Sequence, residues 1–238
     1  TQSLRFEDGS TTHLKRNLSA SNLRTNTFSF WVKRVHISGT QVLFSGGEGT
    51  SNNDFWFRFN SNDKINFSSL GGGAYRAIVE TDAVFRDTTN WYHIVLVIDM
   101  AQSSASDRIE IYVNGEKQTL TFTTTPGQNT DLSINYAGDY YIGRLNYTAT
   151  QWFDGYMAEI NFIDGTAVSP TSFGETKNGV WIAKAYDGSY GSNGFRLEFK
   201  QTGDGSSTAS SSTIGADTSG NDNHWIDYNL DAHDSNMP

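Results

Sequence analysis

The sequence predicts an all-β fold, built as a sandwich or a barrel of antiparallel strands. Short segments of alternating apolar and polar residues recur along the chain, with turn-forming residues between them. The 238 residues include 23 glycines, only 3 prolines and 13% aromatic residues, a composition typical of sheets, turns and aromatic packing. No long stretch repeats with the period of a helix, so minimal helix is expected.

The clearest strand pair lies within Trp91–Gly115. Aliphatic residues occupy both parities of Ile94–Ile98, which predicts a strand that is covered on both faces. Apolar and polar residues alternate in Ile109–Val113, the pattern of a half-buried strand. Asn114-Gly115 follows directly, and both residue types tolerate positive φ, so the segment predicts a tight hairpin turn.

Several strands are predicted before this pair. The segment Phe55–Phe59 places three phenylalanines on one face, with Trp56 and Arg58 on the other. Gly71–Gly73 predicts a flexible loop, because three glycines gain little from any fixed conformation. The other early strands are expected at Leu4–Phe6, Phe28–Lys33, Val42–Phe44, Lys64–Phe67 and Ala77–Thr81.

Later strands are expected at 120–124, 140–143 and 153–163. Ser169 as N-cap with Pro170 at the first helical position then predicts one short helical turn. Beyond it, Gly, Asn, Asp and Ser dominate, and only residues 195–199 predict another strand. We therefore divide the chain into a β-sandwich at residues 1–175 and a C-terminal extension at residues 176–238 that packs on it.

Charge and cysteine content exclude several classes of function. The formal net charge is −9, without a basic stripe, so neither nucleic acid nor an anionic membrane is an expected partner, and no apolar run predicts membrane insertion. The absence of cysteine excludes disulfides and thiolate metal sites and favours folding in a reducing cytosol. Because the chain begins at Thr1 and ends at Pro238 without an obvious terminating feature, we expect it to be a piece of a longer polypeptide.

The order of these segments resembles the laminin G-like branch of the concanavalin A-like lectin/glucanase superfamily. The resemblance covers about Leu4 to Glu175 and implies a two-sheet antiparallel jelly-roll sandwich with ligand sites on rim loops. It is carried by Ser29-Phe30-Trp31-Val32-Lys33, Asn90 to Asp99, Ile111 to Gly115, Tyr141-Ile142-Gly143, Phe153 to Ile160 and Ser169-Pro170.

The C-terminal extension resembles one found on laminin G-like modules of bacteriophage virion proteins. The segments concerned are Gly179-Val180-Trp181, Gly188 to Gly191, Asn193-Gly194-Phe195 and Asp217 to Asn223. The resemblance implies an adhesive module of a tail fibre, capsid fibre or capsid decoration on the exterior of a phage particle. Virion proteins assemble in the bacterial cytoplasm, which agrees with the missing cysteines.

A catalytic role is not expected. Glucanases of this fold carry paired carboxylates at alternating positions of one strand, where they serve as nucleophile and acid. The comparable strand here, Ala158–Phe162, carries the single carboxylate of Glu159, with Asn161 at the alternate position. The sequence therefore predicts that the protein is not an enzyme, with glycoside hydrolysis as a distant alternative.

Two interpretations of the segment Asp217–Asn223 remain open. The segment offers several oxygen ligands within one tight turn, which suits Ca²⁺, and Asp217, Asn221 and Asn223 are the candidate ligands. Similar segments in laminin G-like proteins bind Ca²⁺. Alternatively, the side chains bond their own backbone in an Asx-rich turn, and we favour this reading. No other cofactor is expected.

Exposed aromatic rings that stack on sugar faces, flanked by amide side chains, typify carbohydrate sites. For each single aromatic residue, packing over the edge of the sandwich is the competing interpretation. Trp31, Trp56, Trp91 and Trp181 are expected to serve such packing, and His93 to be a hydrogen-bonded polar group in its strand. The candidate carbohydrate-binding residues are Tyr75, Tyr147, Gln151, Trp152, Tyr190 and Asn193.

We therefore expect a non-catalytic virion module that binds carbohydrate on the host cell surface. The alternative is a purely structural module of a virion fibre or capsid contact, without affinity for glycans. In either case the expected partners include other virion proteins and further copies of the chain, with a trimer as the expected oligomer.

Overall fold

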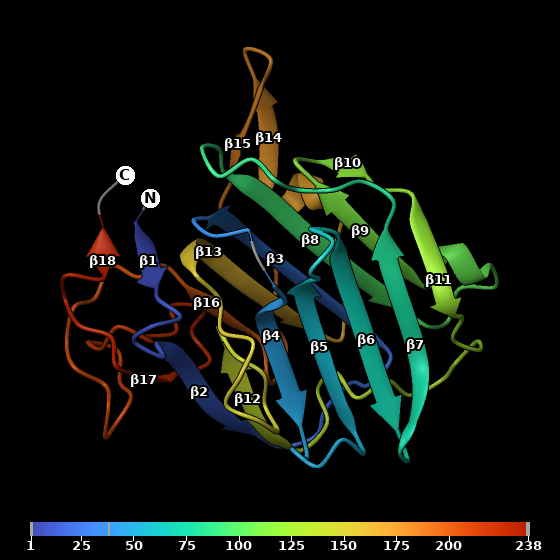
Figure 1. Ribbon diagram of the computed structural model, residues 1–238, viewed down its shortest axis with the longest axis horizontal. Helices are drawn as coiled ribbons and strands as arrows, with labels where there is room; N and C mark the ends of the chain where they lie inside the picture. The colour runs from blue at the N-terminus through green and yellow to red at the C-terminus, as the bar shows by residue number, and fades with distance from the viewer. Residues whose placement is uncertain (1, 38, 237–238) are drawn as a thin grey trace.

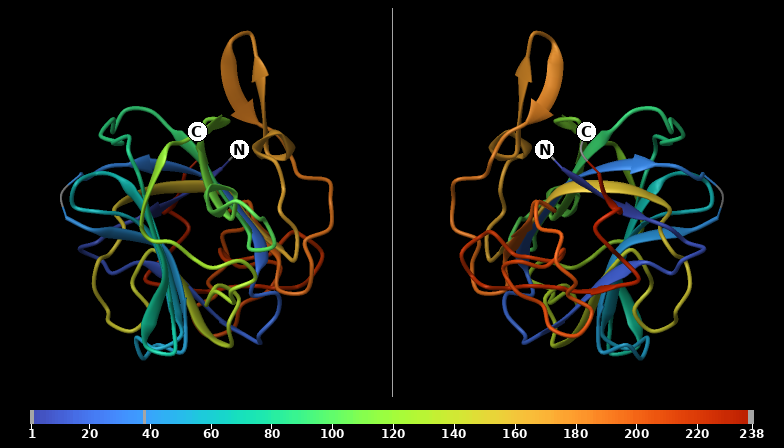
Figure 2. Two further views of the ribbon diagram at one scale, coloured as in Figure 1. Left: turned by 90° about the vertical axis from the view of Figure 1, so that its right-hand side faces the viewer. Right: turned by 90° about the vertical axis from the view of Figure 1, so that its left-hand side faces the viewer.

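The computed structural model describes residues 2–37 and 39–236 and contains two eight-stranded sheets stacked face to face (Figures 1 and 2). Every pairing between named strands is antiparallel, which confirms the predicted sandwich. Sheet A runs through β10 (Glu116–Lys117), β9 (Ile109–Val113), β8 (Tyr92–Asp99), β3 (Thr25–Arg34), β13 (Gly155–Asp164), β1 (Ser3–Phe6) and β18 (Ser235–Asn236), and β16 (Phe195–Leu197) also pairs with β13.

Sheet B forms the second layer. It faces the viewer in Figure 1. Its strands, from one edge to the other, are β11 (Leu120–Thr124), β7 (Ala74–Thr81), β6 (Ile65–Gly71), β5 (Asp54–Phe59), β4 (Gln41–Gly47), β12 (Gly138–Ile142), β2 (His13–Leu18) and β17 (Ile226–Tyr228).

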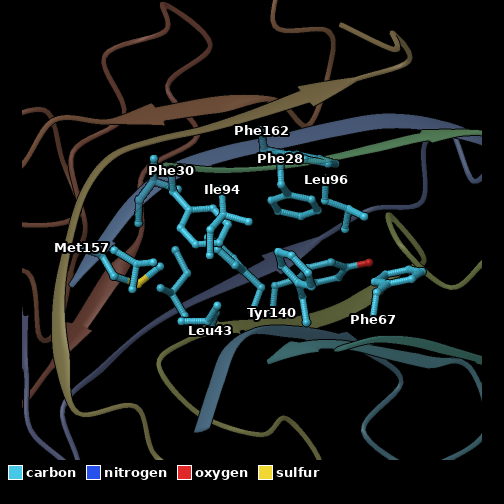
Figure 3. Packing of buried hydrophobic residues seen from close by; sticks show 14 of the residues in the cluster. Phe28, Phe30, Leu43, Phe67, Ile94, Leu96, Tyr140, Met157 and Phe162 are labelled. Carbon is cyan, nitrogen blue, oxygen red and sulfur yellow. The ribbon is translucent and has the colours of Figure 1, made fainter. Parts of the chain in front are cut away.

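The core lies between the inner faces of the two sheets (Figure 3). Phe44 of β4 lies 5.0 Å from both Phe28 and Phe30 of β3, measured between ring centroids. Each buried side chain of this size stabilises the fold by about 1.5–3 kcal/mol. Figure 3 shows this packing around Phe28, Phe30, Ile94, Leu96, Met157 and Phe162 of sheet A and Leu43, Phe67 and Tyr140 of sheet B.

Strand β8 is covered on both faces, as predicted. Ile94, Leu96 and Ile98 point into the core, and Val95 and Val97 belong to a second apolar cluster on the outer face of sheet A. The other buried members of that cluster are Ile163, Phe173 and Tyr190. The segment that follows β13 therefore closes the outer side of sheet A.

The hairpin turn and the short helical turn that were predicted from local sequence both occur in the structure. Asn114 and Gly115 have φ of 51° and 83°, the left-handed pair required by a type I′ hairpin turn. The 3-10 turn η2 (Pro170–Ser172) begins after the N-cap Ser169, as predicted, and a second turn, η1 (Ala105–Asp107), lies in the loop before β9.

The glycine loop predicted to be flexible is a tight turn. Gly71 pairs with Ala74, so only two residues connect β6 and β7, and Gly72 and Gly73 have φ of 62° and 77°. Glycine populates this region without steric cost, so the same residues that predicted flexibility specify a type I′ turn here.

The C-terminal extension contributes strands to both sheets. Strand β16 pairs with β13 and β18 with β1 in sheet A, and β17 pairs with β2 in sheet B. Trp225, just before β17, is 1% exposed and packs edge-on against Phe195 at 5.0 Å. Residues of the extension thus complete the sandwich itself, and the division at residue 175 stays a prediction.

A small hairpin projects from the body. Strands β14 (Gly174–Lys177) and β15 (Val180–Ala183) pair only with each other and extend away from both layers (Figures 1 and 2). Trp181 anchors the base of the hairpin, because its Nε1 donates a hydrogen bond of 2.9 Å to Nδ1 of His93. Within the described ranges, no helix has the length and apolarity to span a membrane.

Candidate functional site

The loop between β12 and β13 lies across the face of sheet B that points away from sheet A (Figure 1). We call residues 143–154 the covering loop and that side of sheet B the outer face. The backbone N–H of Val42 donates to the carbonyl of Gln151 at 2.9 Å, and Ser45 Oγ donates to the carbonyl of Arg144 at 2.7 Å. Leu145 is buried against Val42, Trp56 and Leu70, so the loop is fixed by packing as well as by hydrogen bonds.

Three aromatic residues meet beside this loop and form what we call the aromatic platform: Trp56, Tyr75 and Tyr147. The indole of Trp56 is 3% exposed, and the rings of Tyr75 and Tyr147 contact it edge-on, at centroid distances of 6.1 Å and 6.0 Å. Tyr75 and Tyr147 are 48% and 37% exposed, more than any other Phe, Tyr or Trp side chain in the described residues. The edge-on contacts with Trp56 are a favoured aromatic geometry and orient both tyrosines.

Arg58 borders the platform on β5. Its guanidinium carbon lies 5.4 Å from the centre of the Trp56 ring, and Nη1 donates to Oε1 of Gln151 across 3.5 Å. Burial lowers the pKa of the Arg58 guanidinium, while the nearby hydroxyls of Tyr75 and Tyr147 favour its charged form. Gln151 adopts a left-handed φ of 56°, a conformation that the covering loop holds in place.

Three polar atoms around the platform are buried without a hydrogen-bond partner. They are Nε1 of Trp56, Nε of Arg58 and Oδ1 of Asn146. Asn146 is held in place through its other side-chain atom, Nδ2, which donates to Asp54 at 2.6 Å. Buried polar groups are normally satisfied, so each of these three atoms leaves a hydrogen bond unmade beside the exposed rings.

Trp152 lies in a neighbouring aromatic group on the same face. His13 stacks on Tyr228 at 4.5 Å and contacts Trp152 at 5.5 Å, and the Arg144 guanidinium lies over both Tyr141 and Trp152. Burial lowers the pKa of His13 to about 4, so its ring is neutral at physiological pH.

A hollow opens at each end of the covering loop. The hollow beside Gln151 has a volume of about 340 Å³, and the one beside Tyr147 of about 400 Å³. Gln41 lines the first hollow, is 3% exposed and leaves Oε1 without a partner. The remaining lining residues are Asp8, Gly9, Thr40 and Trp152 in the first hollow, and Asn17, Glu48, Gly49, Gly138, Asp139, Tyr141 and Asn146 in the second.

The structure separates the six predicted carbohydrate-binding residues into two groups. Tyr75, Tyr147, Gln151 and Trp152 gather on the outer face of sheet B. Tyr190 and Asn193 do not belong to this group, and both are only 8% exposed. Tyr190 donates its hydroxyl hydrogen bond to Asn161, and the Asn193 amide donates to Asn135, so both hold the loops behind sheet A together.

Trp56 and Arg58 are further candidate site residues, which the sequence alone does not identify. Their position on the outer face could be inferred from the sequence, because the alternation of Phe55–Phe59 puts these two residues on the face opposite the three phenylalanines. Trp56 was assigned to packing, which is correct for its buried indole, but the sequence does not reveal that Tyr75 and Tyr147 converge on it.

The candidate calcium ligands belong to a turn that is already hydrogen-bonded. Oδ1 of Asp217 accepts from the backbone N–H groups of Arg196 and Ser219, and Oδ2 accepts from Ser219 Oγ and the backbone N–H of Asn223. The amide nitrogens of Asn221 and Asn223 donate to the carbonyl of Gly194. This is the geometry of an Asx-rich turn, and a cation at Asp217 would have to displace four donors.

The calcium hypothesis stays a prediction, and its test is thermal unfolding. Because these donors surround the carboxylate of Asp217, we expect the same melting temperature in EDTA and in millimolar Ca²⁺. A rise in melting temperature with Ca²⁺ that disappears in Asp217→Asn would contradict this expectation and restore the calcium site.

Another group offers metal-ligand atoms from three loops. Single ligand atoms of Asp8, His36 and Asp154 lie within 4.8 Å of one another. Arg5 already forms an ion pair of 2.6 Å with Asp154, however, and Asp8 and His36 are exposed. We attach no function to this group.

The strand compared with glucanases carries one ion-paired carboxylate. Glu159 sits in a β-bulge with a φ of 47°, and its Oε2 lies 2.8 Å from Nη2 of Arg196. Asn161 donates to the carbonyl of Glu159 at 2.9 Å. The strand therefore does not present the alternating pair of carboxylates that the mechanism of these glucanases requires.

Solved structures share this fold at low identity. The chain matches a heptameric SAP-like pentraxin from Limulus polyphemus at 17% identity and a TM-score of 0.50, covering 71% of this chain and 77% of that one. It matches domains LG4-5 of the mouse laminin α1 chain at 14% identity and a TM-score of 0.50, covering 70% of this chain and 45% of that one. It also matches a point mutant of the NanB sialidase from Streptococcus pneumoniae at 16% identity and a TM-score of 0.51. This match covers 72% of this chain and 26% of that one, so the chain spans about a quarter of that protein.

A search of curated proteins gives no match. The Laminin_G_3 family model, described as "Concanavalin A-like lectin/glucanases superfamily", matches residues 8–172. These residues include β2–β13 and so all of the covering loop and the aromatic platform. Because the model matches more than half of the chain, the protein belongs to the laminin G-like family of the concanavalin A-like lectin/glucanase superfamily.

Proposed function

We propose that the protein is a non-catalytic carbohydrate-binding module whose site is the aromatic platform beside the covering loop. The observation that carries the proposal is the convergence of Tyr75 and Tyr147, the two most exposed Phe, Tyr or Trp side chains in the described residues, on the buried indole of Trp56. Apolar ring faces beside a few fixed polar groups are the usual design of a small-ligand site.

Binding of a sugar needs two kinds of contact, aromatic rings for its apolar faces and polar side chains for its hydroxyls. A pyranose presents apolar C–H faces that pack on aromatic rings, and hydroxyls around its edge that need hydrogen-bond partners. Here Tyr75 and Tyr147 supply the exposed rings, while Gln151 supplies an amide group at the border of the platform. Because Trp56 and the covering loop fix these groups in advance, little ordering is needed on binding.

Binding to a glycan array and to whole bacterial cells tests the proposal. We expect the wild-type protein to bind a subset of glycans, and Tyr75→Ala and Tyr147→Ala each to lower affinity about tenfold, the effect of losing about 1.4 kcal/mol of ring contact. Tyr156→Ala is the matched control, because this half-buried tyrosine contacts Trp91 and Arg5 in sheet A.

Three outcomes would overturn the proposal. The first is no binding by the correctly folded wild-type protein on the array or on cells. The second is binding that survives the double variant Tyr75→Ala/Tyr147→Ala but is lost in Tyr156→Ala, which would place the site on the other sheet. The third is trimming of a bound glycan, lost in Glu159→Gln, which would show that the protein is an enzyme.

We further propose that the glycan belongs to the surface of a bacterial host and that the module lies on the exterior of a phage particle. The resemblance of the extension to phage virion modules, at Asp217–Asn223 among other segments, and the lack of cysteine support this context. The genes next to the coding sequence test it directly. We expect capsid or tail genes there, and a neighbourhood of unrelated metabolic genes would contradict the virion assignment.

A second candidate function is a structural module that contacts further copies of the chain. Its support is an apolar hollow of about 280 Å³ on the outer side of sheet A, beside the projecting hairpin. Trp31, Trp91 and Trp181 line it. A stable trimer in solution that is lost in Trp91→Ala, together with no binding on the array, would favour this function over carbohydrate binding.

A further inference from the structure

The pairing of arginines distinguishes Arg58 from the others in the described chain. Half of the arginines form ion pairs with carboxylates: Arg5 with Asp154, Arg24 with Asp131, Arg34 and Arg86 with Asp63, and Arg196 with Glu159 and Glu198. Four more donate to backbone carbonyls: Arg16, Arg76, Arg108 and Arg144. Arg58 has only the amide oxygen of Gln151, across 3.5 Å.

This isolation is energetically unfavourable for the free protein. Arg58 is half-buried, its Nε is fully buried without a partner, and burial lowers the pKa of the guanidinium. A guanidinium needs acceptors for its five N–H donors, and a desolvated cation without a counter-ion is destabilising. The Trp56 ring offsets part of this cost through its π-face at 5.4 Å, but it accepts none of the N–H hydrogen bonds in the plane of the guanidinium.

We infer that Arg58 is an anion-recognition residue and that the ligand of the platform is a saccharide bearing a negatively charged group. The inference rests on the proposed function and names the class of glycan. A carboxylate, sulfate or phosphate at the edge of the sugar would accept from the Arg58 guanidinium while the sugar ring lies on Tyr75 and Tyr147. Planar bidentate recognition of such groups is a property of arginine that lysine lacks.

The surrounding charges leave this position open to an anion. Glu80 pairs with Asn66 of β6, which in turn pairs with Arg58, and its charge raises the pKa of the guanidinium. Its oxygens nevertheless accept from Asn60 and Asn62, and Oε1 lies 3.7 Å from Lys64, so Glu80 forms no ion pair with Arg58. Asp8 borders the hollow on the far side of Gln151, so an anion is disfavoured there. The charged group is therefore expected on the side of Arg58 that faces the platform.

Arg144 serves as a useful contrast on the same face. Its Nε donates to the carbonyl of Leu145 at 3.0 Å, and its guanidinium is covered by Tyr141 and Trp152. Its donors thus hold the covering loop, and Arg144→Gln would perturb the shape of the loop. Arg58 bonds the loop only through Gln151, across 3.5 Å, so Arg58→Gln removes the guanidinium with little change to the fold.

The experiment compares sugars that differ only in charge. The ¹⁵N-labelled protein is titrated with D-glucuronate, with D-glucose 6-sulfate and with D-glucose, and the Nε–H resonance of Arg58 is followed by NMR. We expect both anionic sugars to shift this resonance and to bind at least about tenfold more tightly than glucose, the size of one charge-assisted hydrogen bond. The relative shifts of the two anionic sugars identify whether carboxylate or sulfate is preferred.

Two variants accompany the titration. Arg58→Gln is expected to reduce the affinity for the anionic sugars to that for glucose, and Arg58→Lys to recover only part of it, because lysine keeps the charge without the planar donors. Lys177→Gln, an exposed residue of the projecting hairpin, removes the same charge far from the site and should leave all affinities unchanged.

Each outcome has a distinct meaning. Equal affinity for glucuronate, glucose 6-sulfate and glucose, or anion binding that persists in Arg58→Gln, overturns the inference. If glycans on the array still depend on Tyr75 and Tyr147, the proposed carbohydrate-binding function survives that result. If no glycan of either charge binds, the proposed function itself fails.

Discussion

Acidification from pH 6.5 to pH 4 is expected to reduce the free energy of unfolding by about 5 kcal/mol through two buried histidines. Burial lowers the pKa of both His13 and His93 from 6.5 to about 4. Between these values the unfolded chain binds more protons than the folded protein, so stability is complete above pH 6.5 and falls as the pH drops toward 4. Over its whole range, a shift of this size corresponds to about 3 kcal/mol for each histidine, and most of it falls between pH 6.5 and pH 4.

The hydrogen bonds of the two rings explain why the folded state keeps them neutral. His93 is 1% exposed; its Nδ1 accepts from Trp181, and its Nε2 lies 2.9 Å from Ser29 Oγ. Protonation of Nδ1 would replace that acceptor with a donor and detach the base of the projecting hairpin. His13 lies under Trp152, and its Nδ1 lies 3.0 Å from the carbonyl of Thr11.

Urea unfolding at a series of pH values checks the prediction, with His13→Gln and His93→Gln as comparison proteins. Glutamine can accept and donate at similar positions but does not titrate, so each variant should lose about half of the histidine contribution to the pH slope. Carboxylates titrate in all three proteins, so their contribution to the pH slope cancels when the slopes are compared. Identical slopes in the wild type and both variants would show that neither histidine is responsible.

Replacing Trp225 by alanine is expected to lower the free energy of unfolding by about 3–5 kcal/mol, the usual cost of emptying a large aromatic site in a core. Trp225 is 1% exposed and belongs to the main core together with Phe195 and Phe199. All three lie in the C-terminal extension, so a large effect would show that the extension is an integral part of the sandwich. Equilibrium unfolding in urea measures it.

Val180→Ala is the control within the same extension. Val180 is 61% exposed at the tip of the projecting hairpin, so its truncation should change stability by less than about 0.5 kcal/mol. If Trp225→Ala changes stability as little as Val180→Ala, the extension does not contribute to the core and instead packs on an independently stable sandwich.

The layers of the fold could be predicted because their signals are local. Most of the predicted core strands alternate in polarity along their own sequence, as in Phe55–Phe59, or are apolar on both parities, as in Ile94–Ile98. Asn114-Gly115 and Ser169-Pro170 determine their turn and cap through the conformational preferences of the residues themselves. Such elements require no knowledge of distant neighbours.

Elements defined by distant partners could not be predicted. Strand β2, with the sequence His13-Leu14-Lys15-Arg16-Asn17-Leu18, lacks an apolar alternation, and its pairing with β12 and β17 makes it a strand. Strands β14 and β15 are mostly exposed and owe their position to Trp181, which packs on Gly115 and Gly174. A Cβ on either glycine would approach the Trp181 ring to less than 3.0 Å.

Dependence on distant partners also explains which site residues could be predicted and which could not. An aromatic residue in a polar loop is a good candidate for ligand binding, and this criterion found Tyr147 and Trp152. Tyr190 meets the criterion equally well in sequence, but tertiary contacts bury it beside Asn161. Arg58 is identifiable as a candidate site residue only because, in space, neither a carboxylate nor a backbone carbonyl accepts from it.

The most direct test of the central claim uses the six indole N–H resonances of the protein. A glycan that binds on the array is titrated into the ¹⁵N-labelled protein, and the side-chain resonances are assigned by single substitutions. If the outer face of sheet B is the binding surface, the resonances of Trp56 and Trp152 shift, and those of Trp31, Trp91 and Trp181, which line the hollow on the outer side of sheet A, do not. Shifts confined to these three tryptophans would contradict the assignment of the site.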